Sequence, residues 1–386
     1  MGLKLDVIIP TLLARGGATG VQAHVRQVSR YLAVINVNHA VVTPFDILRP
    51  LSYPLFALRR VLEVVAPAFA IWLYRCGHGA FLRLALRRHL RSGRPCVIYA
   101  QCPVSARSAL AAVRTPEQRV VLVVHFNESQ ADEWVGKGML TRHSRLYRRI
   151  LSEDGETLRN VAGIVFVSRF IQDRLRHTVP GITGVPQTIV PNFLEDSEGP
   201  SRQLPPYDLV SIGTLEPRKN QSFLLDVLAA TRRQGKHYTL AIVGDGPDRA
   251  TLENRTASLG LESQVSFLGR QSQAAQFFSN AKACVHSAIA ETQGIVLIEA
   301  LANSVPVFAP AVGGVPEVFS DGVEGRYWPL DDAERAAQIL CGVLEDTALR
   351  VRMSLAARLR FETAFSSAVA GERLASFLAS CLLPAG

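Results

Sequence analysis

Short, uninterrupted apolar segments alternate with amphipathic segments along the first half of the chain. The apolar segments lie at residues 5–10, 40–44, 96–100, 120–125 and 163–168. Strands that are apolar without alternation are typical of a parallel sheet whose two faces are both covered. Helical periodicity separates them, for example at 21–33 and 168–177. This order predicts a doubly wound α/β domain.

The second half of the chain repeats the pattern. Strands are predicted at 209–213, 239–244, 265–269, 283–286 and 305–309, and helices at 222–234, 249–259, 272–280 and 294–302. A stretch rich in Pro, Gly and Ser around 192–207 marks the boundary between the halves. We therefore predict two doubly wound, Rossmann-like domains at 1–196 and 197–365, followed by a C-terminal segment at 366–386.

Composition agrees with two folded domains and excludes other classes of protein. The chain has 386 residues, of which 48% are hydrophobic and 19% charged, so it is not a disordered polyelectrolyte. The longest uncharged apolar stretches, 64–74 and 374–385, are shorter than the roughly 20 residues of a spanning helix. The N-terminal apolar run contains Asp6 and resembles a buried strand more than a signal peptide. Six cysteines without CxxC spacing indicate a reduced, cytoplasmic interior.

Positive charge is concentrated in the first half. Residues 1–196 hold 25 Lys and Arg against 13 Asp and Glu, whereas the second half is slightly acidic. Residues 47–94 contain nine arginines and only one acidic residue, Glu63. Segments 56–70 and 80–90 mix these arginines with Leu, Phe and Ala, which is typical of a basic amphipathic helix on an anionic membrane surface. The alternative is a solvated helical face that packs on the sheet. Stacking aromatics are too few to indicate a nucleic-acid partner.

Open parallel sheets bind ligands beyond the carboxyl ends of their strands, and several chemically distinctive residues are predicted there. Glu291 and Glu299 are eight residues apart, with Gly294 at a predicted helix start between them. The first glutamate would lie in a loop beside free backbone N–H groups, which suit a phosphate. The second would lie on the helix, where it could accept hydrogen bonds from a diol such as a ribose. The alternative is one N-terminal acid and one solvated acid on an ordinary helix.

A second motif follows the first strand of the second half. Gly213 and Thr214 end the strand, and the adjacent cations Arg218 and Lys219 precede the next helix. Cations in this position favour a diphosphate, although a solvated basic turn would have the same residues.

Two motifs in the first half follow predicted strands in the same way. Gly16 and Gly17 lie in a loop that lets the backbone approach a ligand closely, but the loop fits neither a dinucleotide fingerprint nor a phosphate-binding GK[ST] loop. His125 ends the strand at 120–125, and a polar segment follows it. The candidate acceptor-binding residues in that segment are Asn127, Glu128, Gln130 and Trp134.

In their order along the chain, these motifs resemble glycosyltransferase family 4, the retaining group 1 or glycogen-synthase-like enzymes. The matching segments are the glycine loop, His125, VPN at 190–192, GTLEPRKN at 213–220, VGDGP at 243–247, FLG at 267–269, the glutamate pair and PVFAPAVGGVPE at 306–317. The resemblance implies the GT-B fold, in which two Rossmann-like domains face each other across a cleft. It also implies that the first domain binds the acceptor, that the second binds a nucleotide sugar, and that the C-terminal helix returns to the first domain.

The resemblance assigns roles to individual residues. Catalytic roles fall to His125, near the reacting face of the sugar, to Lys219 on the diphosphate, and to Glu291 on the donor sugar. The donor-binding set is Gly16, Gly17, Thr214, Arg218, Lys219, Gly244, Leu268, Gly269, Glu291, Thr292, Gln293, Gly294, Ile295 and Glu299. In this set Glu299 would bind the ribose, and Leu268 and Gly269 would line the nucleobase pocket.

The chain departs from the family pattern at two positions that affect the chemistry. Thr214 stands where the family often has arginine, and Arg218 could replace that cation. Phe126 stands where an aspartate commonly follows the histidine, which weakens an acid–base role for His125. No Asp-x-Asp motif or His/Cys cluster with metal-ligand spacing is present. We therefore expect a metal-independent reaction with no cofactor beyond the nucleotide-diphosphate sugar.

The expected function is the transfer of a hexosyl group, from a UDP- or GDP-linked sugar, to a saccharide or lipid-linked saccharide in cell-surface polysaccharide or glycolipid synthesis. The expected location is the inner face of the cytoplasmic membrane, contacted through the basic segment 47–94. Two other functions remain open: a GT-B epimerase or hydrolase that acts on the nucleotide sugar, and a non-catalytic scaffold that binds it.

Overall fold

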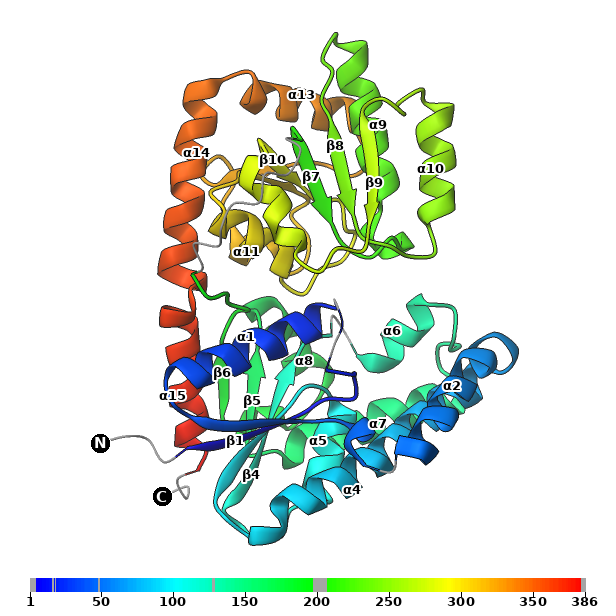
Figure 1. Cartoon of the computed structure of the whole chain (residues 1–386), viewed down its shortest axis with the longest axis vertical. Helices are drawn as coiled ribbons and strands as arrows, with labels where there is room; N and C mark the ends of the chain where they lie inside the picture. Colours follow the sequence, from blue (N-terminus) through cyan, green and yellow to red (C-terminus); the bar gives the residue numbers. More distant parts are fainter. Residues whose placement is uncertain are drawn as a thin grey trace. The chain divides into compact units, whose positions relative to one another are not determined.

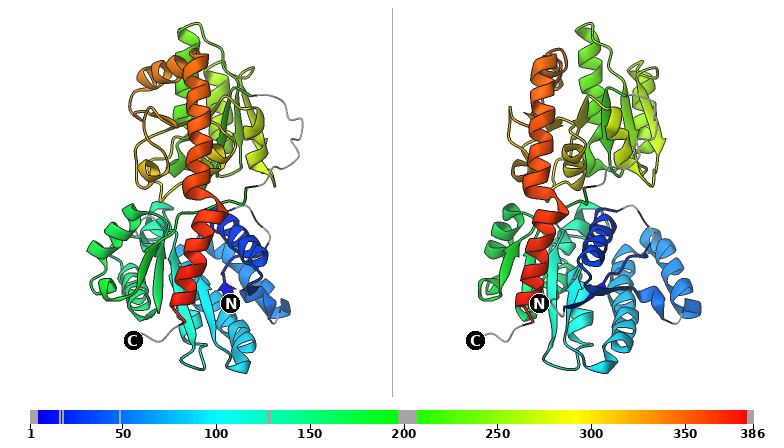
Figure 2. Two further views of the ribbon diagram at one scale, coloured as in Figure 1. Left: turned by 90° about the vertical axis from the view of Figure 1, so that its left-hand side faces the viewer. Right: turned by 60° about the vertical axis from the view of Figure 1, so that its left-hand side comes forward.

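A computed structural model describes residues 5–15, 17, 19–47, 49–126, 129–196 and 207–382. The chain forms two compact units, one built from 1–191 with 371–386 and the other from 192–370. Figures 1 and 2 show that each unit has its own sheet with helices packed around it. The divisions lie five residues from each of the predicted boundaries, at 196 and 365.

Over the described residues, the sheet of the first unit has six parallel strands in the order β2-β1-β3-β4-β5-β6. The chain moves outward from β1 to β2 and then in the opposite direction from β3 to β6. Right-handed crossovers therefore place helices on both faces. The strands are β1 (Asp6–Pro10), β2 (Asn38–Val42), β3 (Cys96–Ala100), β4 (Gln118–Val124), β5 (Gly163–Phe166) and β6 (Gln187–Ile189).

The helices of the first unit cover this sheet and extend beyond it. The C-terminal helix α15 (Glu372–Ser380) packs on β5, because a Cβ added at Gly163 would contact Phe377 and Cys381. Figure 2 shows α15, in red, beside α1, in dark blue. The other helices are α1 (Gly20–Val34), α2 (Arg49–Val65), α3 (Pro67–Leu73), α4 (Gly79–His89), α5 (Pro103–Leu110), α6 (Gln130–Gly136), α7 (Arg145–Asn160) and α8 (Arg169–Thr178).

The part of the second unit that the structure describes also has a sheet of six parallel strands, in the order β12-β11-β10-β7-β8-β9. Its strands are β7 (Leu209–Ile212), β8 (Leu240–Val243), β9 (Val265–Gly269), β10 (Ala283–Val285), β11 (Val307–Ala309) and β12 (Gly325–Tyr327). Its helices are α9 (Gln221–Arg233), α10 (Arg249–Ser258), α11 (Ile295–Ala302), α12 (Val315–Val318), α13 (Ala333–Leu344) and α14 (Thr347–Arg360). Two buried apolar clusters fill this unit, and strand residues contribute to both.

Apart from shifts of one or two residues at the ends of elements, the structure differs from the sequence prediction in three places. The edge strands β6 and β12 were not predicted, because each has only three residues and neither is a continuous apolar run. The segment predicted as an α-helix at 272–280 is a 3₁₀-helix over Ala274–Asn280. The predicted continuous helix at 56–70 is broken at Ala66, where Pro67 begins α3. Proline lacks the N–H that would continue the preceding helix.

Candidate active site

A carboxylate surrounded by cations lies at the carboxyl edge of the second sheet. Lys219 follows β7, and Glu291 lies in the loop between β10 and α11; these two strands are neighbours. The Lys219 ammonium donates a hydrogen bond of 2.5 Å to Oε2 of Glu291, and only 16% and 12% of the two side chains is exposed. The strand order therefore joins two predicted site residues that are 72 positions apart.

Two further cationic or titratable groups approach the same oxygen of Glu291. Nε2 of His286 lies 3.5 Å from Oε2, and a guanidinium nitrogen of Arg218 lies 3.9 Å from it. Burial raises the pKa of Glu291, but Lys219 and His286 outweigh burial, and the pKa falls well below the usual range. Within the described part of the chain, no hydrogen bond or ion pair reaches Oε1. The carboxylate is therefore ionised and keeps one oxygen for another donor.

Hydrogen bonds hold the loops after β7 and β10 against each other. The Ile289 N–H donates to the Arg218 carbonyl, and the Ser287 hydroxyl donates to the Lys219 carbonyl. The Arg218 guanidinium donates to the Ala290 carbonyl at 2.9 Å and to Glu216 at 3.0 Å. These contacts fix the backbone that carries both cations, so Lys219 and Arg218 are positioned before any ligand arrives.

A third loop, which follows β11, contacts the backbone of Glu291. The Gly314 N–H donates to the Glu291 carbonyl at 3.0 Å. Gly313 has a φ of 57°, and a Cβ there would lie 1.9 Å from the Glu291 carbonyl oxygen. The close approach therefore requires glycine at this position. Gly294, with a φ of 85°, is the N-cap of α11 and has no side chain that could cap the helix, so N–H groups of the first turn are suited to an anion.

The loop after β8 also lies close to the loop after β7. Gly244 has a φ of 148°, and a Cβ there would lie 1.8 Å from the Gly213 carbonyl oxygen. Its N–H donates to the carbonyl of Gly269, at the end of β9. Thr214 is exposed beside this junction, and Leu268 is half-buried in β9. The predicted donor-binding residues of β7, β8 and β9 thus lie along one edge of the sheet.

Some predicted donor-binding residues have contacts within the protein. Oε1 of Gln293 accepts 2.7 Å hydrogen bonds from both the backbone N–H and the side-chain amide of Asn192. Thr292 is buried beside it, whereas Ile295 and Glu299 on α11 are half-buried. The contacts assign Gln293 a structural role in holding the glutamate loop.

His125 lies in the first unit, directly after β4. Its Nε2 is 3.3 Å from Oε1 of Gln101, and its ring packs edge-on against His24, with centroids 4.6 Å apart. Burial and the neighbouring His24 lower the pKa of His125 well below the usual histidine range. The imidazole is therefore neutral near pH 7. Phe126, the departure from the family pattern, is buried beside it.

The two described candidate acceptor-binding residues after His125, Gln130 and Trp134, have structural contacts. Oε1 of Gln130 accepts a 2.8 Å hydrogen bond from Arg75, a buried arginine that also pairs with Asp154 at 2.6 Å. Trp134 packs against the small apolar cluster around Ile71 and Tyr147. Both side chains thus help to join α6 to the rest of the unit. Gly16, Asn127 and Glu128 lie outside the described residues, and Gly17 is the described part of the glycine loop.

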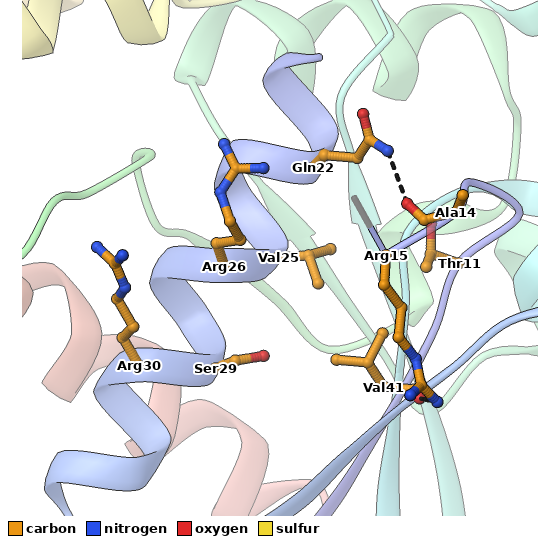
Figure 3. Close-up of a pocket in the computed structure, with 9 residues that line it drawn as sticks. All are labelled: Thr11, Ala14, Arg15, Gln22, Val25, Arg26, Ser29, Arg30 and Val41. Carbon is orange, nitrogen blue, oxygen red and sulfur yellow. Dashed lines mark hydrogen bonds between the residues drawn. The ribbon is translucent and has the colours of Figure 1, made fainter. Parts of the chain in front are cut away.

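A small cavity of about 310 Å³ lies between α1, β2 and the segment after β1. Figure 3 shows Val25 and Ser29 directed toward Val41, while the guanidinium groups of Arg26 and Arg30 point away from that side of the helix. None of the candidate site residues lines this cavity.

Four residues of these sites were not predicted: His24, Gln101, His286 and Ser287. Gln101 and His286 follow β3 and β10 directly. Their position at the end of a strand, which identified His125, could therefore have identified both of them. His24 lies on a helix, and no sequence signal connects it with His125. Within the described residues, no three His, Cys, Asp or Glu side chains form a group that could hold a metal ion.

Two family models match the chain. The model described as "Glycosyl transferases group 1" matches residues 194–360, and the model described as "Glycosyltransferase Family 4" matches residues 18–198. The first includes Lys219, Glu291 and Glu299, and the second includes His125. Together they extend over both units.

Individual proteins resemble the chain over most of its length. A GDP-mannose-dependent alpha-(1-6)-phosphatidylinositol monomannoside mannosyltransferase of Mycolicibacterium smegmatis is 28% identical over 284 residues, which is 67% of this chain and 69% of the relative. The structure of sucrose-phosphate synthase from Thermosynechococcus elongatus has a TM-score of 0.73 at 19% identity and covers 96% of this chain and 98% of its own. The structure of the Anabaena protein HepE in complex with UDP and glucose has a TM-score of 0.68 at 18% identity. The match covers 97% of this chain and 100% of the HepE chain.

Proposed function

Because the chain belongs to the group 1, family 4 glycosyltransferases and has their two-domain GT-B fold, we propose that it is a retaining hexosyltransferase. It would use a UDP- or GDP-linked sugar and a saccharide or lipid-linked saccharide acceptor. The observation that carries the proposal is the carboxylate–cation cluster of Glu291, Lys219 and Arg218 at the carboxyl edge of the second sheet.

The cluster suits a sugar joined to a diphosphate. Oε1 of Glu291 can accept hydrogen bonds from sugar hydroxyls, while Oε2 is held by Lys219. A bound diphosphate would compete with Oε2 for the Lys219 ammonium and would also attract Arg218, which is half-exposed. Arg218 would then replace the cation that the family often has as arginine at the position of Thr214. The uncapped start of α11 adds N–H groups for the same anion.

The proposed reaction is a same-face displacement. The bond from the anomeric carbon to the diphosphate oxygen breaks, and the acceptor oxygen forms a bond to the anomeric carbon on the same face. The acceptor proton passes to the departing diphosphate. Negative charge develops on the leaving group, and Lys219, Arg218 and the N–H groups of α11 stabilise it. The protein residues contribute electrostatic stabilisation and positioning, without a covalent intermediate.

A transfer assay with purified protein tests this function. UDP- and GDP-sugars are offered with saccharide and lipid-linked acceptors, in buffer containing EDTA, and the product is analysed by proton NMR. We expect one nucleoside diphosphate per transferred sugar, an unchanged anomeric configuration and full activity in EDTA. Inversion, or activity that EDTA abolishes and manganese or magnesium restores, would contradict the mechanism. Donor turnover that needs no acceptor would favour the epimerase or hydrolase alternative, and donor binding without turnover would favour the scaffold.

We also propose that the first unit contacts the inner face of the cytoplasmic membrane. Large apolar side chains at the end of α2 and along α3 are exposed: Val61, Val64, Val65, Phe69 and Trp72. Phe69 and Trp72 stack on each other with ring centroids 5.5 Å apart. None of the helices that the structure describes has the length and apolar character needed to cross a bilayer. The Mycolicibacterium smegmatis relative is a phosphatidylinositol monomannoside mannosyltransferase, which supports a lipid-linked acceptor for this chain.

The structure limits the residues of 47–94 that could contact the membrane. Arg75 is buried against Asp154, and Arg59 pairs with Glu63 and lies over the Tyr74 ring. The side chains of Leu55, Phe56 and Arg60 lie outside the described part of the structure, and Leu62 is half-buried. Exposed arginines remain on and after α4 at positions 83, 87, 88, 91 and 94. At about 1 kcal/mol each near an anionic bilayer, these suffice for reversible association.

Sedimentation with vesicles separates the two contributions. We expect binding to anionic vesicles at low salt and weaker binding at high salt, because salt screens the arginines. The double change Arg87→Gln and Arg88→Gln should lower the binding to vesicles at low salt. The double change Val64→Ser and Phe69→Ser should remove the vesicle binding that persists at high salt. Leu355→Ser with Leu359→Ser, on exposed positions of α14, is the matched apolar control and should have no effect. Failure of the unmodified protein to sediment at low salt would leave 47–94 an ordinary solvated surface.

A further inference from the structure

The side-chain amide of Gln101 has a defined orientation in the first unit. Gln101 follows β3 directly and is buried, with 3% of its surface exposed. Its side-chain N–H donates a 2.9 Å hydrogen bond to the Tyr99 carbonyl oxygen, and its backbone N–H donates to the Ser105 hydroxyl at 3.0 Å. A flipped amide would place two oxygens against each other at Tyr99. The Tyr99 carbonyl therefore determines which end of the amide faces β4.

The end of the amide that faces β4 is an acceptor. Oε1 of Gln101 lies 3.3 Å from Nε2 of His125. An amide oxygen has no hydrogen to donate, so this contact is favourable only when Nε2 of His125 carries a hydrogen. In a neutral imidazole one ring nitrogen holds the hydrogen and the other holds the lone pair. The hydrogen on Nε2 therefore leaves Nδ1 as the acceptor of the ring.

A second residue restrains the orientation of the same ring. His24, on α1, is buried and packs edge-on against His125. Nε2 of His24 is 3.1 Å from the Tyr99 hydroxyl, so the ring of His24 is also held. The start of α1 is fixed by a capping box between Thr19 and Gln22. The imidazole of His125 is thus held by β3 through Gln101 and by α1 through His24.

From this geometry we infer that Gln101 is a positioning residue that holds His125 as the neutral Nε2–H tautomer, so that His125 accepts a hydrogen bond at Nδ1. This excludes His125 as a general acid that supplies a proton from Nδ1. It also gives a physical reason why this chain can have Phe126 in place of the aspartate. A carboxylate would stabilise a protonated imidazole, and a neutral imidazole that accepts a hydrogen bond does not need that stabilisation. The tautomer is a property of the ligand-free protein, and its importance for transfer rests on the proposed function.

The tautomer can be measured without any substrate. The full chain is labelled with ¹⁵N-histidine, and long-range ¹H–¹⁵N correlation spectra are recorded near pH 7. The signal of His125 is assigned by its loss in His125→Gln. We expect the pattern of a neutral ring with the hydrogen on Nε2. In Gln101→Leu, which lacks the acceptor, the pattern should move toward a mixture of both tautomers. In Gln101→Glu, which keeps an acceptor and adds charge, the hydrogen should stay on Nε2 and the ring should protonate at higher pH than in the unmodified protein.

A wild-type ring with the hydrogen on Nδ1, or an unchanged pattern in a folded Gln101→Leu variant, would overturn the inference. If Gln101→Leu fails to fold, the tautomer of His125 in the unmodified protein and the pH at which the ring protonates in Gln101→Glu still test the inference. Failure of the proposed function is visible separately, as absence of transfer by the unmodified enzyme. If transfer occurs, Gln101→Leu should lower kcat/KM about tenfold, the size expected for loss of one hydrogen bond. Gln101→Glu should restore activity only above the pH at which its His125 loses the added proton.

Discussion

Replacing Lys219 with alanine is expected to lower kcat/KM for sugar transfer about a hundredfold. The Lys219 ammonium lies at the carboxyl edge of the second sheet, where the diphosphate of the donor would develop negative charge. Removing one group that stabilises such charge typically raises the barrier by about 3 kcal/mol, which corresponds to roughly two orders of magnitude. The measurement is the initial rate of transfer by the purified variant over a range of donor concentrations.

Lys219→Ala should also lower the stability of the protein. It leaves the Glu291 carboxylate, which is only 12% exposed, without its 2.5 Å partner. Leaving a buried polar group unsatisfied costs about 1 to 3 kcal/mol, and a charged group costs more, but the remaining Arg218 and His286 should keep the loss within that range. Folding is therefore checked by thermal unfolding before rates are compared.

A matched control is available in the same unit. Lys282 pairs with Asp208 at 2.7 Å, but it precedes β10 and so lies at the amino edge of the sheet. Lys282→Ala removes the same charge and should leave kcat/KM unchanged. Equal activity of Lys219→Ala and Lys282→Ala would remove Lys219 from the site.

Replacing Glu291 with glutamine is expected to produce a loss of similar size by a different route. The pKa of Glu291 lies well below the usual range, so the substitution removes a full negative charge at every ordinary assay pH. Glutamine has nearly the same shape, but it binds sugar hydroxyls and Lys219 less strongly than a carboxylate does. We expect kcat/KM to fall about a hundredfold, as measured in the same initial-rate assay.

Binding of the free nucleoside diphosphate distinguishes this variant from Lys219→Ala. In Glu291→Gln the Lys219 ammonium no longer has a carboxylate partner, so UDP or GDP alone should bind at least as tightly as to the unmodified enzyme. In Lys219→Ala it should bind more weakly. Glu334→Gln, which neutralises an exposed carboxylate on α13 that pairs with Arg233 of α9, is the control. Weaker nucleotide binding in Glu291→Gln would contradict the competition between Glu291 and the diphosphate for Lys219.

The sequence predicted the central strands of both sheets well because these strands are buried on both faces. The strand at Cys96–Ala100, whose five residues are all buried, agrees with the structure to the residue. Apolar runs of this kind are determined by burial alone, so they can be recognised without knowledge of their neighbours. The short edge strands Gln187–Ile189 and Gly325–Tyr327 gave no such signal.

The sequence predicted the site residues that are identified by their position after a strand. It did not predict the contacts between their side chains. Lys219 and Glu291 follow strands, and the strand order of a doubly wound sheet brings such ends together. Their ion pair, the participation of His286 and the engagement of Gln293 by Asn192 depend on side-chain directions that no spacing specifies. The same limit applies to 47–94, where composition alone did not distinguish the buried Arg75 from the exposed Arg87 and Arg88.

Thermal unfolding of the full chain with a panel of nucleotides and nucleotide sugars tests whether the carboxyl edge of the second sheet binds the donor, because a ligand that binds the native state raises its apparent stability. We expect UDP or GDP, and at least one sugar linked to the same nucleotide, to raise the Tm in the presence of EDTA. The increase should be smaller in Lys219→Ala but kept in Lys282→Ala. No stabilisation by any nucleotide, or equal stabilisation of both variants, would contradict the assignment of the donor site to the carboxyl edge of the second sheet.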